Sequence, residues 1–188
     1  MDDRIELVGG VEQRTIQIVD YDPAWPRRFA QERDRIASAL GATARRIDHI
    51  GSTAVPGLAA KPIVDLQVSV PDVDDQAAYL DRLLAAGYQL RVREPGHIMV
   101  RTPELNVHVH VCSAGSEWER RHLLLRDWLR RDADDRDAYG RLKRDLAERE
   151  WPDMNAYAAA KGPLIAAITQ RAEAWARSCG WTPENRPA

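Results

Sequence analysis

The feature that most constrains this chain is the stretch of residues 49–70, in which a loop of small residues joins two strand-like segments. Gly51 opens the loop, and glycine adopts backbone conformations that other residues resist. Ser52 and Thr53 follow, so the loop offers hydroxyls and successive backbone N–H groups, which can bind an anion. Residues 63–70 are rich in β-branched side chains, which indicates a core strand. The stretch therefore predicts an anion-binding turn held between two strands.

Asp65 interrupts the second of these strands, which is otherwise apolar. A carboxylate in such a place is costly unless it is paired, hydrogen-bonded or bound to a metal. Lys61 adds a positive charge just before the strand. Two interpretations stay open: Asp65 holds a divalent metal such as Mg²⁺, or it is a buried carboxylate that caps the Ser52 loop or pairs with Lys61.

The composition bounds the class of protein. The chain has 188 residues, which favours a single domain over residues 1–188. Its formal net charge of −2 argues against general nucleic-acid binding, because no basic excess is present to neutralise phosphates. No apolar run approaches the roughly 18 residues of a membrane span, and we expect no signal peptide. The two cysteines lack the spacing of a disulfide framework, which favours a cytoplasmic location.

Periodicity and turn residues predict an α+β fold. A mixed sheet with flanking helices is expected within residues 15–112, and a helical bundle within residues 116–178. Ser116 with Glu119 forms the pattern of a capping box, and Asp134 or Asp135 is expected to cap the next helix. Gly162 and the proline after it predict a break in the last helical segment. Strands are expected at residues 15–21, 45–50, 63–70, 88–92, 98–101 and 105–112.

The last of these strands carries two histidines. Strict alternation puts Val107, Val109 and Val111 on one face. His108 and His110 then share the other face, where paired imidazoles can bind a metal or a substrate phosphate. The alternative is a strand face whose histidines meet solvent or hydrogen-bond within the protein.

Three cations in the helical part lie on or near faces that should point inward. Lys143 and Lys161 each come four residues after a tyrosine of an apolar stripe, and Arg126 lies beside another stripe. A cation on an inward face needs an anion, which a ligand phosphate can supply. The alternatives are that the side chains extend to the rim or pair with Asp127 or Asp65.

Together these motifs resemble the signature of the GrpB family, a branch of the nucleotidyltransferase fold of the DNA polymerase beta type. That superfamily carries Gly-Ser, about a dozen residues, and then Asp-x-Asp or Asp-x-Glu on a strand, as Gly51, Ser52 and Asp65 do here. The GrpB pattern also includes a His-x-His strand, an Arg-Asp pair at residues 126–127 and Tyr-x-x-x-Lys twice. The resemblance covers about residues 15–175, and it implies a nucleotidyltransferase-like fold.

The chain departs from the superfamily at position 67, where Gln67 replaces the second carboxylate. A neutral amide adds no charge, so the chain lacks the second carboxylate that the superfamily's two-metal mechanism uses. A third carboxylate of that fold sits near the His-x-His strand, and His110 can take its place. Asp65, His108 and His110 then suit Zn²⁺, Mn²⁺ or Fe²⁺ better than Mg²⁺.

Three hypotheses follow. In the first, the protein binds a nucleotide or other phosphorylated small molecule, and Asp65 and His110 are the catalytic residues of a metal-dependent nucleotidyl or phosphoryl transfer. The second is a non-catalytic accessory module for a nucleotide or coenzyme A, since GrpB-like segments resemble ones fused to dephospho-coenzyme A kinase. The third is a metal-dependent hydrolase. The expected phosphate-binding residues are Gly51, Ser52, Thr53, Lys61, Arg126, Lys143 and Lys161.

Overall fold

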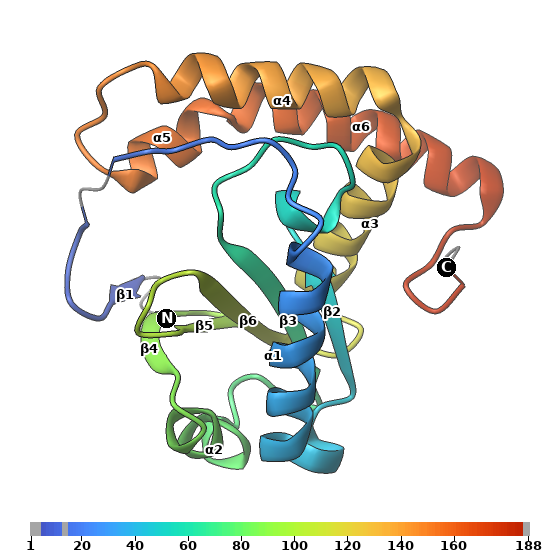
Figure 1. Ribbon diagram of the computed structural model, residues 1–188. Coiled ribbons are helices and arrows are strands. Elements are labelled where there is room, and N and C mark those ends of the chain that lie inside the picture. Colours follow the sequence, from blue (N-terminus) through green and yellow to red (C-terminus); the bar gives the residue numbers. More distant parts are fainter. Residues whose placement is uncertain (1–4, 13–14, 186–188) are drawn as a thin grey trace.

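A six-stranded mixed sheet forms the centre of the computed structural model, which describes residues 5–12 and 15–185 (Figure 1). The strand order is β1-β4-β5-β6-β3-β2, and β3 and β6 run parallel while the other described neighbours are antiparallel. The strands are β1 Glu6–Leu7, β2 Arg46–Ile50, β3 Val64–Val70, β4 Gln89–Glu94, β5 His97–Arg101 and β6 Val107–Ser113.

Helices flank this sheet and continue beyond it, so the α+β fold class is confirmed. α1 and α2 pack against the sheet, whereas α4, α5 and α6 lie together at one end of the molecule (Figure 1). The helices are α1 Trp25–Leu40, α2 Leu80–Ala85, α3 Glu117–Arg131, α4 Ala133–Ala147, α5 Met154–Ala160 and α6 Gly162–Cys179, with the short 3₁₀ turns η1 Gly41–Thr43, η2 Ser52–Ala54 and η3 Gln76–Ala78. No helix in the described part of the chain is long and apolar enough to cross a membrane.

The two faces of the sheet differ in chemistry. Val64, Leu66 and Val68 of β3 point to one face, where they are buried in a cluster with side chains of α1 and α2. Asp65, Gln67 and Ser69 alternate with them and therefore point to the opposite face. A slip of one residue would move Asp65 into the apolar cluster, so burial of the apolar face fixes the register of β3.

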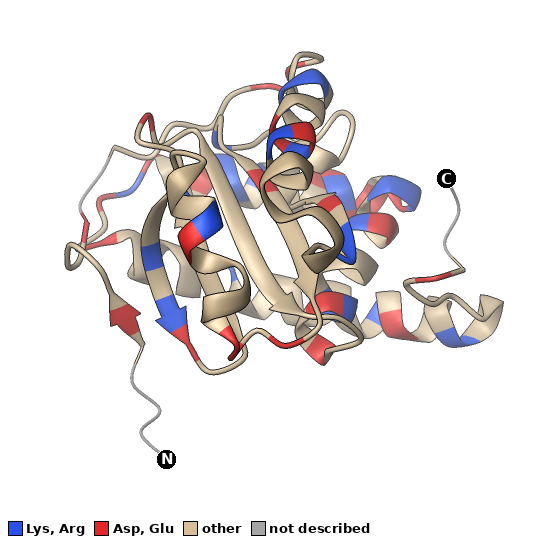
Figure 2. Ribbon diagram, turned by 90° about the horizontal axis from the view of Figure 1, so that it is seen from below, with Lys and Arg blue, Asp and Glu red and all other residues tan. Residues whose placement is uncertain are grey.

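The helical part holds the loop that follows the Gly-Ser turn. Val55 and Leu58 of this loop are buried against Leu129 of α3, Tyr139 of α4 and Ile168 of α6. The loop therefore joins the sheet to three helices. As Figure 2 shows, residues of both charge signs are interspersed along the helices, in keeping with the small net charge of −2.

The strand expected at residues 15–21 is wrong. Val19 forms a single isolated bridge with Ala60, and the rest of the segment has no ladder partner among the described residues. The alternation arises because this segment turns alternate side chains toward the molecule without joining the sheet. The sheet also begins earlier than residue 15, because Glu6 and Leu7 pair with β4.

The predicted helix boundaries are partly confirmed. Ser116 caps α3 and accepts a hydrogen bond from the Glu119 amide at 3.3 Å. The Glu119 carboxylate does not complete a capping box, because it accepts from Gly115 and from the Ser69 hydroxyl. Asp132 caps α4 in place of Asp134 or Asp135, which already lie in the first helical turn. The expected break is confirmed, since α5 ends at Ala160 and α6 begins at Gly162.

Candidate functional site

The turn after β2 depends on Gly51. Its backbone has φ +70° and ψ −171°, a combination that essentially only glycine adopts. A Cβ atom at this position would also lie 2.6 Å from Oδ2 of Asp65. Glycine is therefore required both for the backbone conformation and for the close approach of the turn to the Asp65 carboxylate.

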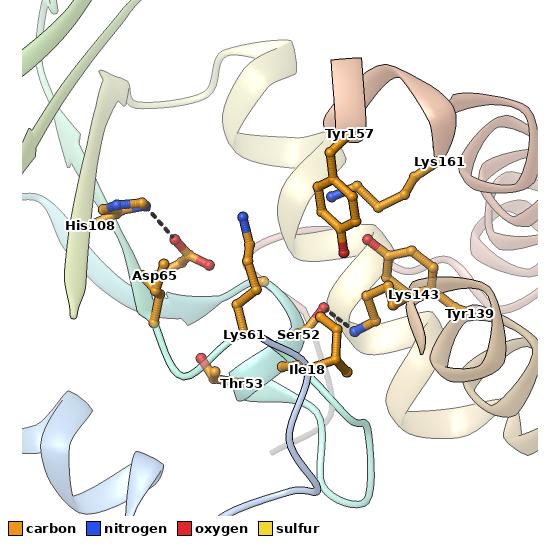
Figure 3. A pocket seen from close by; sticks show the side chains of 13 residues that line it. Ile18, Ser52, Thr53, Lys61, Asp65, His108, Tyr139, Lys143, Tyr157 and Lys161 are labelled. Atoms are coloured by element: carbon orange, nitrogen blue, oxygen red, sulfur yellow. Dashed lines mark hydrogen bonds and ion pairs between the residues drawn. The ribbon is translucent and has the colours of Figure 1, made fainter. Parts of the chain in front are cut away.

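A cavity of about 210 Å³ lies over this turn (Figure 3). Its walls come from the Gly-Ser turn, β3, β6, α4 and the α5–α6 junction, which are far apart in the sequence. The structure thus brings together most of the predicted residues. The cavity is lined by Gly51, Ser52, Thr53, Lys61, Asp65, His108, Lys143 and Lys161, together with Tyr139, Tyr157 and three apolar residues.

Three lysine ammonium groups surround two tyrosine rings in this cavity. Lys143 is 3% exposed, donates a hydrogen bond to the Ser52 hydroxyl at 2.8 Å and also donates to the Ala59 carbonyl. Its Nζ lies 4.5 Å from the centre of the Tyr139 ring. The Nζ atoms of Lys161 and Lys61 lie 4.7 and 5.3 Å from the centre of the Tyr157 ring.

The lysines raise the positive potential of the cavity. Burial, followed by the charges of Lys161 and other cations, lowers the pKa of Lys143 to about 7. Burial and the charge of Lys61 lower the pKa of Lys161 to about 8. Among the described residues that line the cavity, three are lysines and one is an aspartate. An anionic ligand would relieve this repulsion.

The Tyr157 hydroxyl is a further unsatisfied group in the cavity wall. Tyr157 is 1% exposed, and its buried hydroxyl makes no hydrogen bond to any described residue. Burial raises the pKa of this phenol, so the group keeps its proton and can donate. Because a buried hydroxyl without a partner costs free energy, a ligand acceptor at this point would be favoured.

Asp65, His108 and His110 form a compact group of possible metal ligands. One donor atom from each lies within 4.8 Å of the others. His108 Nδ1 and His110 Nε2 lie 3.4 and 3.5 Å from Asp65 Oδ1, longer than ordinary hydrogen bonds. Burial alone would raise the pKa of the Asp65 carboxyl, but the two histidines hold it below its usual range. The carboxylate is therefore ionised and has both rings beside it.

A second layer of residues orients His110. Glu94 accepts a hydrogen bond from His97 Nδ1 at 2.6 Å, and His97 Nε2 lies 2.9 Å from His110 Nδ1. Burial lowers the pKa of His97 to about 3, so this ring is neutral and its Nε2 can only accept. His110 then donates from Nδ1 to His97, which turns its Nε2 toward Asp65. One carboxylate and two imidazoles gathered in this way are a donor set that suits a divalent metal.

Trp118 of α3 holds this group of rings in place. It stacks on His97, His122 and His110, with ring centres 4.6, 3.7 and 5.5 Å away. His122 Nδ1 in turn donates to the Trp118 carbonyl at 2.7 Å. The imidazoles therefore lie against a rigid aromatic wall and cannot rotate freely.

Arg126 is not brought to the cavity, in contrast to our expectation. Its guanidinium donates to Asp127 at 2.7 Å and to the His49 carbonyl at 3.0 Å, and the side chain is only 6% exposed. Helical periodicity placed it near an inward face, but the packing of α3 turns it toward the end of β2. Arg126 thus supports the strand that leads into Gly51. The alternative interpretation therefore holds for Arg126, because the carboxylate of Asp127 neutralises its charge.

Gln67 lies beneath the site without entering the cavity. It pairs in register with His110 of β6 and is completely buried. Both polar atoms of its side chain lack a hydrogen-bond partner among the described residues. A side chain at this position does not reach the cavity, so Gln67 is not placed to act on a ligand there.

The sequence interpretation did not find the pair of His97 and Glu94. Both residues flank a two-residue turn, Pro95 and Gly96, which joins β4 to β5. The hairpin was the signal that could have indicated this pair. Met99 pairs with His110, and His97 lies two residues before Met99 on the same face of the sheet. The register of β5 against β6 was needed to see it.

The geometry defines a class of protein: a mixed α+β sheet in which a Gly-Ser turn abuts a strand aspartate beneath a lysine-lined cavity. Residues 15–171 match the family described as GrpB protein. The chain therefore belongs to the GrpB family, and the nucleotidyltransferase-like resemblance is consistent with that membership.

Relatives extend over most of the chain. The UPF0157 protein SCO7215 of Streptomyces coelicolor is 54% identical over 170 residues, which cover 90% of this chain and 91% of the relative. A dephospho-CoA kinase of Mycolicibacterium paratuberculosis is 31% identical over 202 residues, covering 92% of this chain but 50% of the kinase. The crystal structure of the conserved protein GrpB from Enterococcus faecalis aligns with a TM-score of 0.74 and 29% identity, covering 85% of this chain and 99% of that one.

Proposed function

We propose that this protein binds a nucleotide or another phosphorylated small molecule together with one divalent cation in the cavity over the Gly-Ser turn. The observation that carries the proposal is the group of three lysines gathered around the Gly-Ser turn: Lys143, which is buried, and Lys61 and Lys161, which are partly exposed. A phosphate balances their charge and accepts their hydrogen bonds.

The side chains divide between two parts of the ligand. Figure 3 places Lys61 between the Asp65–His108 pair and the group formed by Lys143 and Lys161. The phosphate is expected among the lysines, where the Tyr157 hydroxyl, which has no partner among the described residues, can also donate to it. Asp65, His108 and His110 would hold the cation at the other side of Lys61. When bound, Zn²⁺ or Mn²⁺ would supply further positive charge to the phosphate.

Nucleotidyl or phosphoryl transfer is the catalytic form of this proposal, with Asp65 and His110 as its central residues. The lysines would then stabilise charge on the transferred group. A non-catalytic module that binds a nucleotide or coenzyme A is the second candidate. The specific observation that favours it is the match to half the length of a dephospho-CoA kinase. A His/Asp metal-dependent hydrolase requires the same cation but no nucleotide.

A thermal-shift panel tests the proposal. Wild type, Asp65→Asn and Lys143→Met are each melted with nucleoside mono-, di- and triphosphates and with coenzyme A, with and without Mn²⁺ or Zn²⁺. A ligand that binds the folded state raises Tm by mass action. We expect a shift that needs Lys143 and grows with the cation only while Asp65 is present. If no phosphorylated compound shifts the wild type, the cavity is not a phosphate site.

Turnover separates the candidates that share this site. Release of labelled pyrophosphate or phosphate from a nucleoside triphosphate, lost in Asp65→Asn, supports catalysis at this site, and recovery of the remaining group on an acceptor other than water supports transfer. Binding without turnover supports the accessory module. Stoichiometric metal in the purified protein without any nucleotide-dependent shift supports the hydrolase.

A further inference from the structure

A second cavity, of about 400 Å³, opens beside the first. The two cavities share Lys61, Ile63 and His108 in their walls. The second extends from this shared wall across β5 and β4 to the segment around Glu12. Of the expected phosphate-binding residues, only Lys61 lines this second cavity. Its other side chains have no part in the proposed binding of a phosphate.

Two arginines reach this cavity from neighbouring strands. Arg101 of β5 lies directly opposite His108 of β6, so the two share a face of the sheet. Arg91 lies in β4 at a β-bulge between Leu90 and Val92. Arg91 and Val92 both line the cavity, although regular alternation would send consecutive side chains to opposite faces. The bulge therefore aims a buried arginine into the space, a known use of bulges beside functional sites.

The arginines hold a carboxylate of the same chain. Arg101 donates two parallel hydrogen bonds to Glu12, at 3.1 and 2.7 Å. Arg91 Nη2 approaches the same carboxylate at 3.9 Å. Arg91 is 7% exposed, so its charge is largely removed from water. A guanidinium that donates to both oxygens of a carboxylate, as Arg101 does here, recognises that group specifically.

The remaining wall is about half apolar, and the other half is polar or charged. The apolar part includes Leu7, Val11, Val92, Met99, Leu105 and Met154. Methionines and aliphatic side chains favour an apolar body, while Arg91 and Arg101 favour an anionic end. The ligand that matches both is a small organic acid with an apolar body.

We propose that this second cavity binds such a carboxylic acid, with its carboxylate on Arg91 and Arg101 in the position that Glu12 occupies in the free protein. Glu12 is then an internal competitor that the acid displaces. Binding of the acid does not depend on the phosphate cavity. Its role as a second substrate, placed next to the cation by the shared wall at His108, rests on the proposed function.

Calorimetry with 4-phenylbutyrate and its neutral amide, 4-phenylbutanamide, tests the site. The wild type should bind the acid and not the amide. Glu12→Gln removes the competing charge and should bind the acid about tenfold or more tightly, because the effective concentration of a tethered competitor is on the order of millimolar. Arg101→Lys keeps the charge but loses the paired donors, and should abolish the gain in the Glu12→Gln background.

Two controls make the outcome unambiguous. Arg93→Gln removes another arginine–glutamate ion pair, which Arg93 of β4 forms with Glu6 of β1 at 2.5 Å. Arg93 does not line the cavity, so this variant should leave acid binding unchanged. Lys143→Met should abolish the nucleotide shift and leave acid binding unchanged, so failure of either proposal is seen separately. Three results would overturn the proposal. The first is that Glu12→Gln binds 4-phenylbutyrate no more tightly than the wild type does. The others are that the amide binds as well as the acid, or that neither the wild type nor Glu12→Gln binds the acid.

Discussion

Replacement of Gly51 by alanine is the sharpest test of how the turn and the carboxylate depend on each other. The backbone at φ +70° and ψ −171° costs roughly 1–3 kcal/mol for a residue with a Cβ atom. The new Cβ would lie 2.6 Å from Asp65 Oδ2, whereas real Cβ atoms essentially never come within 3.0 Å of a neighbour. The oxygen must therefore move by at least 0.4 Å, the difference between those two distances.

Both effects have measurable sizes. For a domain of this length, a loss of roughly 1–3 kcal/mol lowers Tm by about 2–12 °C, which leaves a protein of ordinary stability folded at room temperature. The displaced carboxylate should weaken binding of Zn²⁺ or Mn²⁺ about 10- to 100-fold, a cost typical of disturbed metal-site geometry. Thermal melts give the first quantity and calorimetry gives the second.

Gly180→Ala is the matched control. Gly180, after the end of α6, has φ +67°, yet a Cβ atom added there meets no described atom within 4 Å. It should lose roughly 1–2 kcal/mol of stability from the backbone alone and keep its metal affinity. If Gly51→Ala melted like the wild type and bound metal equally well, the coupling of the turn to Asp65 would be refuted.

The other predictions concern the charges and the second layer of the site. Affinity for a phosphorylated ligand should fall as pH rises above about 7 to 8, because the pKa values of Lys143 and Lys161 are lowered to about 7 and 8 and the anion needs the protonated forms; calorimetry across pH 6–9 checks this. The free energy of unfolding without ligand should rise with pH above about 7, because Lys143 then keeps its proton in the unfolded chain but loses it in the folded one. Urea denaturation at a series of pH values should show this rise in the wild type and a smaller one in Lys143→Met. Glu94→Gln should weaken metal binding about 10- to 100-fold by releasing the orientation of His110, with little change in Tm; equal affinity would exclude a positioning role for Glu94.

α3 links the two halves of the molecule at the site. Its Trp118 packs on the imidazoles, while Arg126 binds the carbonyl of His49, two residues before Gly51. Glu119 accepts a hydrogen bond from Ser69 of β3. A single helix therefore fixes the rings, the entrance to the turn and the strand of Asp65, which explains how a site assembled from distant segments stays in register.

Local sequence was enough where the physical reason is local. Gly51 and the β-branched residues around Asp65 predicted a turn followed by a strand, because glycine permits backbone conformations closed to other residues and β-branched side chains favour extended backbone. The alternation that placed His108 and His110 on one face was also sufficient, since a strand has a period of two. The inward positions of Lys143 and Lys161 followed from helical spacing in the same way.

Tertiary structure decided what those faces meet. Helical spacing could not tell that Arg126 faces Asp127 and His49 while Lys143 faces Ser52, because periodicity gives a face but not its neighbour. The segment at residues 15–21 alternates like a strand but forms a single bridge, between Val19 and Ala60, among the described residues, because alternation does not reveal whether another strand lies alongside. The bulge that turns Arg91 toward Glu12 depends on pairing between strands. The sequence by itself determined which side chains share a surface, and only the packing of distant segments decided which charges and rings lie opposite one another.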